Sequence, residues 1–134
     1  MPTNKELTIR LEDRPGTLGN VCRALAEHKV NIIALQSYSS EGKGLVRFVV
    51  DNPWNAKNGL DNEGVSYQET DIVQAKLSYR PGGLARAATR LGEADINIEY
   101  AYSGVDPNTN TPLLIFGVAE AGQAAAILDR AAAA

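Results

Sequence analysis

The feature that most constrains the fold of this chain is an internal repeat with a spacing of 66 residues. The segment LEDRPGTLGN begins at Leu11, and LSYRPGGLAR begins at Leu77. Each copy carries Arg-Pro-Gly with a leucine two residues later, and each carries Asn-Ile 15 residues after that glycine. Turn formers and apolar residues that recur at fixed spacing are typical of a duplicated structural unit. The sequence therefore predicts two similar units in tandem.

The length of the chain fits two small units of this kind. Its 134 residues are 44% apolar and 22% charged, both near the averages for globular proteins. Beyond Ser103 the second copy slips by two residues, where the longer segment GVDPNTNTP replaces SEGKG. Surface loops tolerate such insertions. We expect one unit at residues 1–70 and the other at residues 71–134.

Both copies predict the same order of secondary structure. Alternating apolar residues predict a strand at 7–11 and at 73–77, and helical spacing predicts a helix after each turn, beginning at Pro15 or Gly16 in the first copy. Segments rich in β-branched residues predict two strands after each helix. Asn52 and Pro53 then cap and open a short helix, and VSYQET at 65–70 predicts a fourth strand. The fold class is α+β, with two ferredoxin-like βαββαβ units in tandem, of which the second has no residues left for its last strand.

The segment NIIALQSY, which begins at Asn31, has apolar residues on both faces of its expected strand. Ile32 and Ala34 share one face, and Ile33 and Leu35 share the other. A sheet with helices on one side only normally shows polar residues on its open side. We therefore expect that side to be covered, and a second copy of the chain in a homodimer is the expected cover.

The two Arg-Pro-Gly turns are the candidate binding sites. Each lies between a strand end and a helix start, where free backbone N–H groups and the helix dipole favour an anion such as a carboxylate. The side chains of Asn31 and Asn97 can accept from an ammonium group, and we expect each to lie near its own turn. These groups together describe an amino-acid pocket. The alternative is that proline and glycine only shape the turn and that asparagine only bridges backbone groups.

The strand and helix order, the turn DRPGTL and the helices that end in VNI or INI resemble the ACT domain. The two copies together resemble a tandem ACT-domain protein over nearly the whole chain. The resemblance implies a regulatory module that binds an amino acid, usually at an interface between two such domains. It implies a first ligand site lined by Asp13, Arg14, Pro15, Gly16, Thr17, Leu18, Asn31 and Ile32. It implies a second ligand site lined by Arg80, Pro81, Gly82, Gly83, Leu84, Asn97 and Ile98.

Two departures from the family pattern shape the functional prediction. Tyr79 stands where the first copy has Asp13, whose carboxylate can hold a ligand ammonium, so the first turn is the better candidate. Most ACT domains regulate an enzyme domain on the same chain, and this sequence has none. We expect a non-catalytic regulatory or sensor protein that binds a free amino acid and acts on a separate metabolic enzyme or regulator. The alternative is an interaction subunit that has lost the ligand and acts by protein contact alone.

The remaining features argue against other classes of function. The net charge of −3 and the pI near 5.1 disfavour nucleic-acid binding, and KGLVRFV lacks an aromatic residue expected of an RNA-recognition strand. His28, the only histidine, lies near a helix end, and Cys22, the only cysteine, falls on an apolar helix face. We expect no catalytic residue, no metal and no cofactor. With no signal pattern and no membrane span, we expect a cytoplasmic protein with neither a membrane nor a nucleic-acid partner.

Overall fold

The structure is a computed structural model that describes residues 3–77 and 80–133. These residues form two compact units, of which the first is Lys5–Thr70 and the second is the described chain from Asp71 onward together with Thr3 and Asn4. The first elements are β1 (Thr3–Glu12), α1 (Thr17–Glu27), β2 (Ile32–Ser40), β3 (Lys43–Val50) and α2 (Pro53–Asn62). They are followed by β4 (Tyr67–Lys76), α3 (Gly83–Glu93), β5 (Tyr100–Val105), β6 (Pro112–Gly117) and α4 (Ala121–Ala133).

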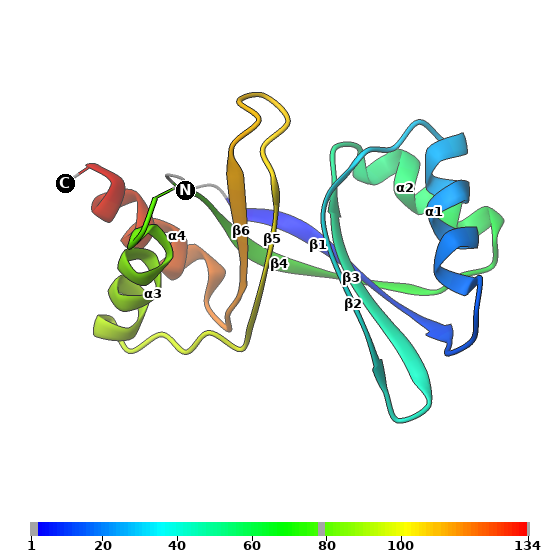
Figure 1. Cartoon of the computed structure of the whole chain (residues 1–134), viewed down its shortest axis with the longest axis horizontal. Coiled ribbons are helices and arrows are strands. Elements are labelled where there is room, and N and C mark those ends of the chain that lie inside the picture. Colours follow the sequence, from blue (N-terminus) through cyan, green and yellow to red (C-terminus); the bar gives the residue numbers. More distant parts are fainter. Residues whose placement is uncertain (1–2, 78–79, 134) are drawn as a thin grey trace. The chain divides into compact units, whose positions relative to one another are not determined.

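The first unit is an antiparallel sheet with two helices packed on one face. β1 pairs with β3, and β3 pairs with β2. Figure 1 shows α1 and α2 lying together beside these strands. The side chains between the helices and the sheet form the core, which comprises Leu7, Ile9, Val21, Leu25, Val30, Val46, Phe48, Val50, Ala56 and Leu60. Alternate residues of β3, namely Val46, Phe48 and Val50, therefore face the helices.

The second unit repeats this arrangement. β4 pairs with β6, and β6 pairs with β5, again antiparallel. Helices α3 and α4 pack on one face of this sheet (Figure 1). Its core comprises Val73, Ala75, Ala87, Leu91, Phe116, Val118, Ala121, Ala124, Ala125 and Leu128. The predicted α+β fold with two ferredoxin-like units in tandem is confirmed.

The two units share strands along the chain. β4 is continuous, so its residues up to Thr70 belong to the first unit and those from Asp71 belong to the second. β1 is divided as well, because Asn4 belongs to the second unit, where its Nδ2 donates to Oε1 of Gln74 over 3.0 Å. Among the residues that the structure describes, no strand follows α4. The start of β1 therefore belongs to the unit in which the described chain has no strand after its second helix.

Each Arg-Pro-Gly turn ends at its glycine, and the helix begins at the next residue. Gly16 is the N-cap of α1 and has φ 92° and ψ −16°, so the helix begins at Thr17 and not at Pro15 or Gly16. Gly82 caps α3 with nearly the same angles, φ 93° and ψ −11°. A Cβ atom at either glycine would meet no atom within 4 Å. The left-handed backbone conformation, and not a close neighbour, is therefore what favours glycine in both turns.

A β-bulge changes which side chains of β2 face the helices. Ile32 pairs with Val50 and Ala34 pairs with Val49, which leaves Ile33 as the extra residue. Ile32 and Leu35 consequently both pack against the first core, although simple alternation put them on opposite faces. Ala34 and Val49 are buried on the other face of the sheet. A second copy of the chain as the cover of this face stays a prediction.

The buried faces of α1 and α3 are not fully equivalent. Ala26 is exposed and Ala24 is buried, because the inward stripe of α1 runs through Val21, Ala24 and Leu25. Leu84, the counterpart of Leu18, is 50% exposed, whereas Leu18 packs against the first core. The repeated leucine after the turn therefore has a core role in the first unit only.

The hairpin between β5 and β6 is held by a buried carboxylate. Asp106 is 4% exposed, its Oδ1 accepts from the N–H of Asn108 over 2.9 Å, and its own N–H donates to the carbonyl of Thr111. Its Oδ2 lies 2.9 Å from Nζ of Lys76 on β4 and accepts no other hydrogen bond within the described chain. The hydrogen bond from Lys76, followed by that from Asn108, holds the pKa of the Asp106 carboxyl below its ordinary value.

This contact predicts a loss of stability in acid. Because the carboxyl pKa is lower in the folded protein, the contribution is complete above the ordinary aspartate pKa of about 4 and disappears as the pH falls through the folded value. Titration by carboxyl carbon NMR should show Asp106 below that ordinary value, and Lys76→Gln should move it back. Lys57→Gln, which breaks the Lys57–Glu69 ion pair instead, is the control and should leave Asp106 unchanged. An Asp106 that titrates normally would contradict the assignment.

Candidate functional site

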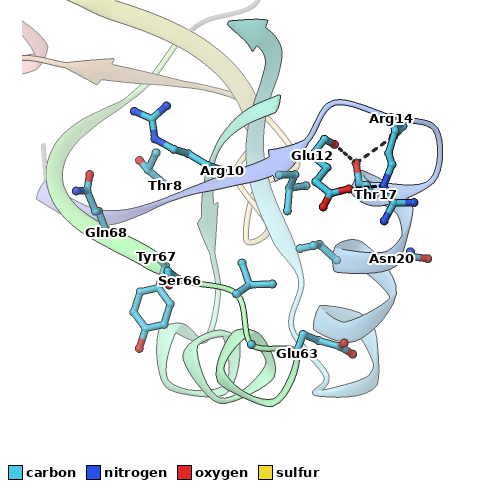
Figure 2. A pocket seen from close by; sticks show the side chains of 14 residues that line it. Thr8, Arg10, Glu12, Arg14, Thr17, Asn20, Glu63, Ser66, Tyr67 and Gln68 are labelled. Atoms are coloured by element: carbon cyan, nitrogen blue, oxygen red, sulfur yellow. Dashed lines mark hydrogen bonds and ion pairs between the residues drawn. The ribbon is translucent and has the colours of Figure 1, made fainter. Parts of the chain in front are cut away.

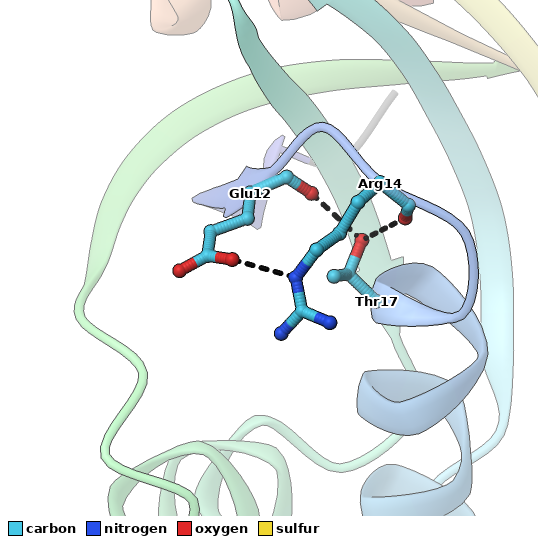
Figure 3. A network of polar contacts seen from close by, with 3 residues as sticks. All are labelled: Glu12, Arg14 and Thr17. Atoms are coloured by element: carbon cyan, nitrogen blue, oxygen red, sulfur yellow. Dashed lines mark hydrogen bonds and ion pairs between the residues drawn. The ribbon is translucent and has the colours of Figure 1, made fainter.

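A network of three side chains fixes the shape of the first Arg-Pro-Gly turn (Figure 3). Nε of Arg14 donates to Oε2 of Glu12 over 2.6 Å. The hydroxyl of Thr17 lies 2.9 Å from the carbonyl oxygen of Glu12 and 3.1 Å from that of Arg14, and donates to this pair. The hydrogen bond and the positive charge of Arg14 hold the pKa of the Glu12 carboxyl below its ordinary value. The network ties the end of β1 to the first residue of α1.

A small pocket of about 260 Å³ lies against this turn. The turn contributes Glu12, Asp13, Arg14, Gly16 and Thr17 to its lining. The hairpin between β2 and β3 contributes Ser37, Tyr38, Ser39 and Gly44, and apolar contacts come from Leu11, Leu18 and Val46. The hairpin reaches the turn because Glu12 and Ser40 both pair with Lys43, so the end of β1 and the hairpin share one end of the sheet. Carboxylate, guanidinium, hydroxyl and apolar groups therefore surround one small space.

A larger pocket of about 690 Å³ is also bordered by this turn (Figure 2). One wall is β1, with Thr8, Arg10, Leu11 and Glu12, and the start of α1, with Thr17, Asn20 and Val21. The opposite wall is the segment from the end of α2 into β4, comprising Glu63, Gly64, Val65, Ser66, Tyr67 and Gln68. Arg14 completes the lining. Leu11, Glu12, Arg14 and Thr17 line both pockets, so the turn network is a wall that the two pockets share.

The structure brings part of the predicted first site together. Asp13, Gly16 and Leu18 line the small pocket, and Arg14 and Thr17 line both pockets, whereas Pro15 lines neither. The other expected members, Asn31 and Ile32, lie at the opposite end of the sheet. Ile32 pairs with Val50, while the turn end of β1 pairs with Lys43 at the far end of β3. The expectation that Asn31 lies near its own turn is therefore not met.

Asn31 is instead engaged by a carboxylate at the end of β3. Its N–H donates to Oδ1 of Asp51 and its Nδ2 donates to Oδ2, both over 2.9 Å. The N–H of Asp51 in turn donates to the carbonyl of Asn31. In the second copy Ala119 stands where the first has Asp51, so this pairing has no equivalent at Asn97. The two asparagines of the repeat thus have different surroundings.

The second turn has the same backbone but different side chains. Arg80, Pro81 and Gly82 are exposed, and Gly83 begins α3. Gly83 replaces Thr17, so the hydroxyl contacts of the first turn have no counterpart. Asn97 is exposed and Ile98 packs against the second core, again at the end of the sheet away from the turn. Tyr79, on which the predicted inequality of the two turns depends, lies outside the described residues.

His28 and Cys22 have structural surroundings. Nδ1 of His28 donates to the carbonyl of Ala24 over 2.9 Å, and its Nε2 accepts from Nδ2 of Asn62 over 3.0 Å. Through these two hydrogen bonds, the imidazole of His28 joins α1 to α2. Cys22 is half-buried on α1, and burial raises the pKa of its thiol, which opposes formation of a nucleophilic thiolate.

Sequence reasoning missed the hairpin serines of the small pocket and the 63–68 segment of the large one. Neither segment carries a sequence motif. The hairpin serines reach the turn through the pairing of β2 with β3, and the 63–68 segment reaches the pocket as the chain passes from α2 to β4. No helix within the described ranges is long and apolar enough to cross a membrane.

Comparison with known proteins agrees with the duplicated fold. A family model described as an ACT domain pair matches residues 2–131. Among solved structures, protein BT0572 from Bacteroides thetaiotaomicron has a TM-score of 0.84 and 26% identity, covering 96% of this chain and 88% of that chain. The ligand-free regulatory subunit of aspartate kinase from Thermus thermophilus has a TM-score of 0.65 and 18% identity, covering 96% and 91%. No curated protein matches the chain significantly. On its family match and its duplicated fold, this chain belongs to the ACT domain pair family.

Proposed function

We propose that this protein is a non-catalytic regulatory module that binds a small free amino acid beside its first Arg-Pro-Gly turn. The observation that carries the proposal is the small pocket, which combines both kinds of polar group that an amino acid requires. Its volume of about 260 Å³ lies just below the range of roughly 300–1,000 Å³ typical for drug-sized ligands, so it suits a smaller molecule.

The lining residues divide into three chemical roles. The carboxylate of Asp13 is suited to the ligand ammonium group, since Glu12 is already engaged by Arg14. The ligand carboxylate is suited to Arg14, to the serine hydroxyls of the hairpin and to the backbone N–H groups at the start of α1. Leu18 and Val46 offer apolar contact to a short side chain. Together these roles favour a small amino acid over a large one.

We further propose that the ligand acts on a separate protein. A regulatory subunit of aspartate kinase shares this fold over 96% of the chain, which supports a regulatory role. Asn31 and Asn97 lie away from the turns of their own units, so neither asparagine contributes to the turn of its own unit. The binding form that we propose is a homodimer, in which a second copy of the chain covers the open side of the sheet. Ligand binding would then favour one assembly over another through its different affinity for the two.

The test is calorimetric titration of the full chain with each of the twenty amino acids. At least one small amino acid should bind saturably, and Asp13→Asn should weaken that binding by about tenfold, because it removes one charge-assisted hydrogen bond. Asp61→Asn, an exposed position on α2 outside the small pocket, is the matched control and should bind like the wild type. A panel without heat, or equal affinities for the two variants, would count against this function.

A further inference from the structure

The larger pocket has an apolar base that is surrounded by polar and charged side chains. Its apolar lining residues Leu11, Val65 and Tyr67 are partly buried and pack against the first core, and Val21 belongs to that core. Polar and charged side chains stand around these residues, on β1, on α1 and on the 63–68 segment (Figure 2). Its volume of about 690 Å³ is within the range of small-molecule sites and exceeds the needs of a small amino acid. We propose that this pocket is a second binding site, for a carboxylate that carries an apolar body.

The pocket has two cationic groups, Arg10 on β1 and Arg14 in the turn that follows it, which lie on either side of Glu12 (Figure 2). Arg10 on β1 has no ion-pair partner within residues 3–77 and 80–133. Arg14 meets the Glu12 carboxylate through Nε, as Figure 3 shows, and its two terminal nitrogens make no hydrogen bond to a described residue. Guanidinium groups bind carboxylates through paired N–H donors, and Arg10 and Arg14 both have such donors available for a ligand carboxylate. Each of these two guanidinium groups, one on β1 and one in the turn, favours the anionic end of a ligand on this side of the pocket.

The anionic groups of the pocket orient the ligand. Glu12 faces Arg14 and is engaged by it, while Glu63 lies on the opposite wall at the end of α2 (Figure 2). Glu63 has no ion-pair partner among the described residues and repels a second carboxylate. A monocarboxylate with its charged end at β1 and its apolar body over Leu11, Val21 and Val65 satisfies both walls. A dianion does not.

The shared wall links this site to the small pocket. Glu12, Arg14 and Thr17 line both, and their hydrogen bonds hold the turn in one arrangement. A carboxylate that draws Arg14 away from Glu12 changes a side chain that also lines the amino-acid pocket. The two ligands then alter each other's affinity by the same factor. This coupling rests on the proposed amino-acid function, whereas the carboxylate site itself does not.

The test uses phenylacetate and its neutral analogue phenylacetamide as probes, titrated into the full chain without amino acid and followed by amide NMR. Phenylacetate should shift signals of Val65, Ser66 and Tyr67 saturably, and phenylacetamide should bind about tenfold more weakly. Arg10→Gln should weaken phenylacetate by a similar factor. Glu12→Gln should strengthen it, because Arg14 loses its competing partner. Arg86→Gln, which exchanges an exposed arginine of α3 outside both pockets, is the control.

The possible results separate the two proposals. Equal binding of the acid and the amide, or an unchanged affinity in Arg10→Gln, would overturn the carboxylate site. The same holds if phenylacetate binds nowhere near the 63–68 segment. Saturable phenylacetate binding in a chain that binds no amino acid would uphold this site and reject the proposed function. Amino-acid binding without phenylacetate binding would do the reverse.

Discussion

Gly117→Ala is expected to destabilise the protein by about 1–3 kcal/mol or more, as overpacking of a well-packed interior does. Gly117 on β6 pairs with Tyr100 on β5, and the phenol ring lies over the glycine. A methyl group at position 117 would overlap with several carbons of that ring. The ring is also stacked on Tyr102, with centroids 6.4 Å apart and planes inclined by 8°, so moving it disturbs a second side chain. Urea unfolding of the variant and the wild type measures the loss.

Gly122→Ala is the matched control for this substitution. Gly122 lies in α4, and a Cβ atom there would meet nothing within 4 Å. The change should therefore stabilise the protein by up to about 1 kcal/mol through helix propensity. If both variants lose stability equally, the ring contact at position 117 is not the cause.

In the first unit, the equivalent pair of residues has its larger and smaller side chains on the opposite strands. Ala34 pairs with Val49 at the positions equivalent to Tyr100 and Gly117, so one unit places the small residue on β2 and the other places it on β6. Tyr100→Ala together with Gly117→Val reproduces the first-unit pair in the second unit. A double-mutant cycle should then give a favourable coupling energy, since the removed ring makes room for the added side chain. If the stability losses of the two single variants simply add in the double variant, the two side chains do not compensate for each other.

The repeat made the fold predictable because its regularities are local. Apolar alternation at 7–11, helical spacing after each turn and the Asn52 cap each report on a single element, and Asn52 does accept from the N–H of Asn55. The bulge at Ile33 was not predictable in this way. It depends on how β2 meets β3, and a shift of one residue exchanges the two faces of a strand.

The candidate site was likewise predictable only in the part that comes from residues contiguous in the sequence. The turn residues Asp13 to Leu18 are contiguous, and most of them line the small pocket. Asn31 was misplaced because the turn and the start of β2 are separated by the length of α1, whose 11 residues rise about 16 Å at 1.5 Å each. Ser37 and Ser39 were missed because only the pairing of β2 with β3 carries them to the turn. No short motif records such a meeting.

Leu25→Ala and Leu91→Ala should each cost about 2–5 kcal/mol, as expected for a buried leucine whose removal leaves a cavity. The two residues are equivalent in the repeat, and each is almost completely buried in the core of its own unit. We also expect each substitution to destabilise both units. β4 passes from the first unit into the second, and β1 begins in the second and continues in the first. Unfolding either unit thus removes part of a strand from the other.

Both variants should for this reason lower one common unfolding transition. Native-state hydrogen exchange of the amides of α1 and α3 measures the two units separately, and each variant should reduce protection in both helices by a similar free energy. Leu84→Ala is the control, because this leucine lies on α3 but is half exposed, and its loss should cost under about 1 kcal/mol. If Leu91→Ala weakens protection in α3 and leaves α1 unchanged, the units unfold independently. In that case the shared strands connect the two units without coupling their stability.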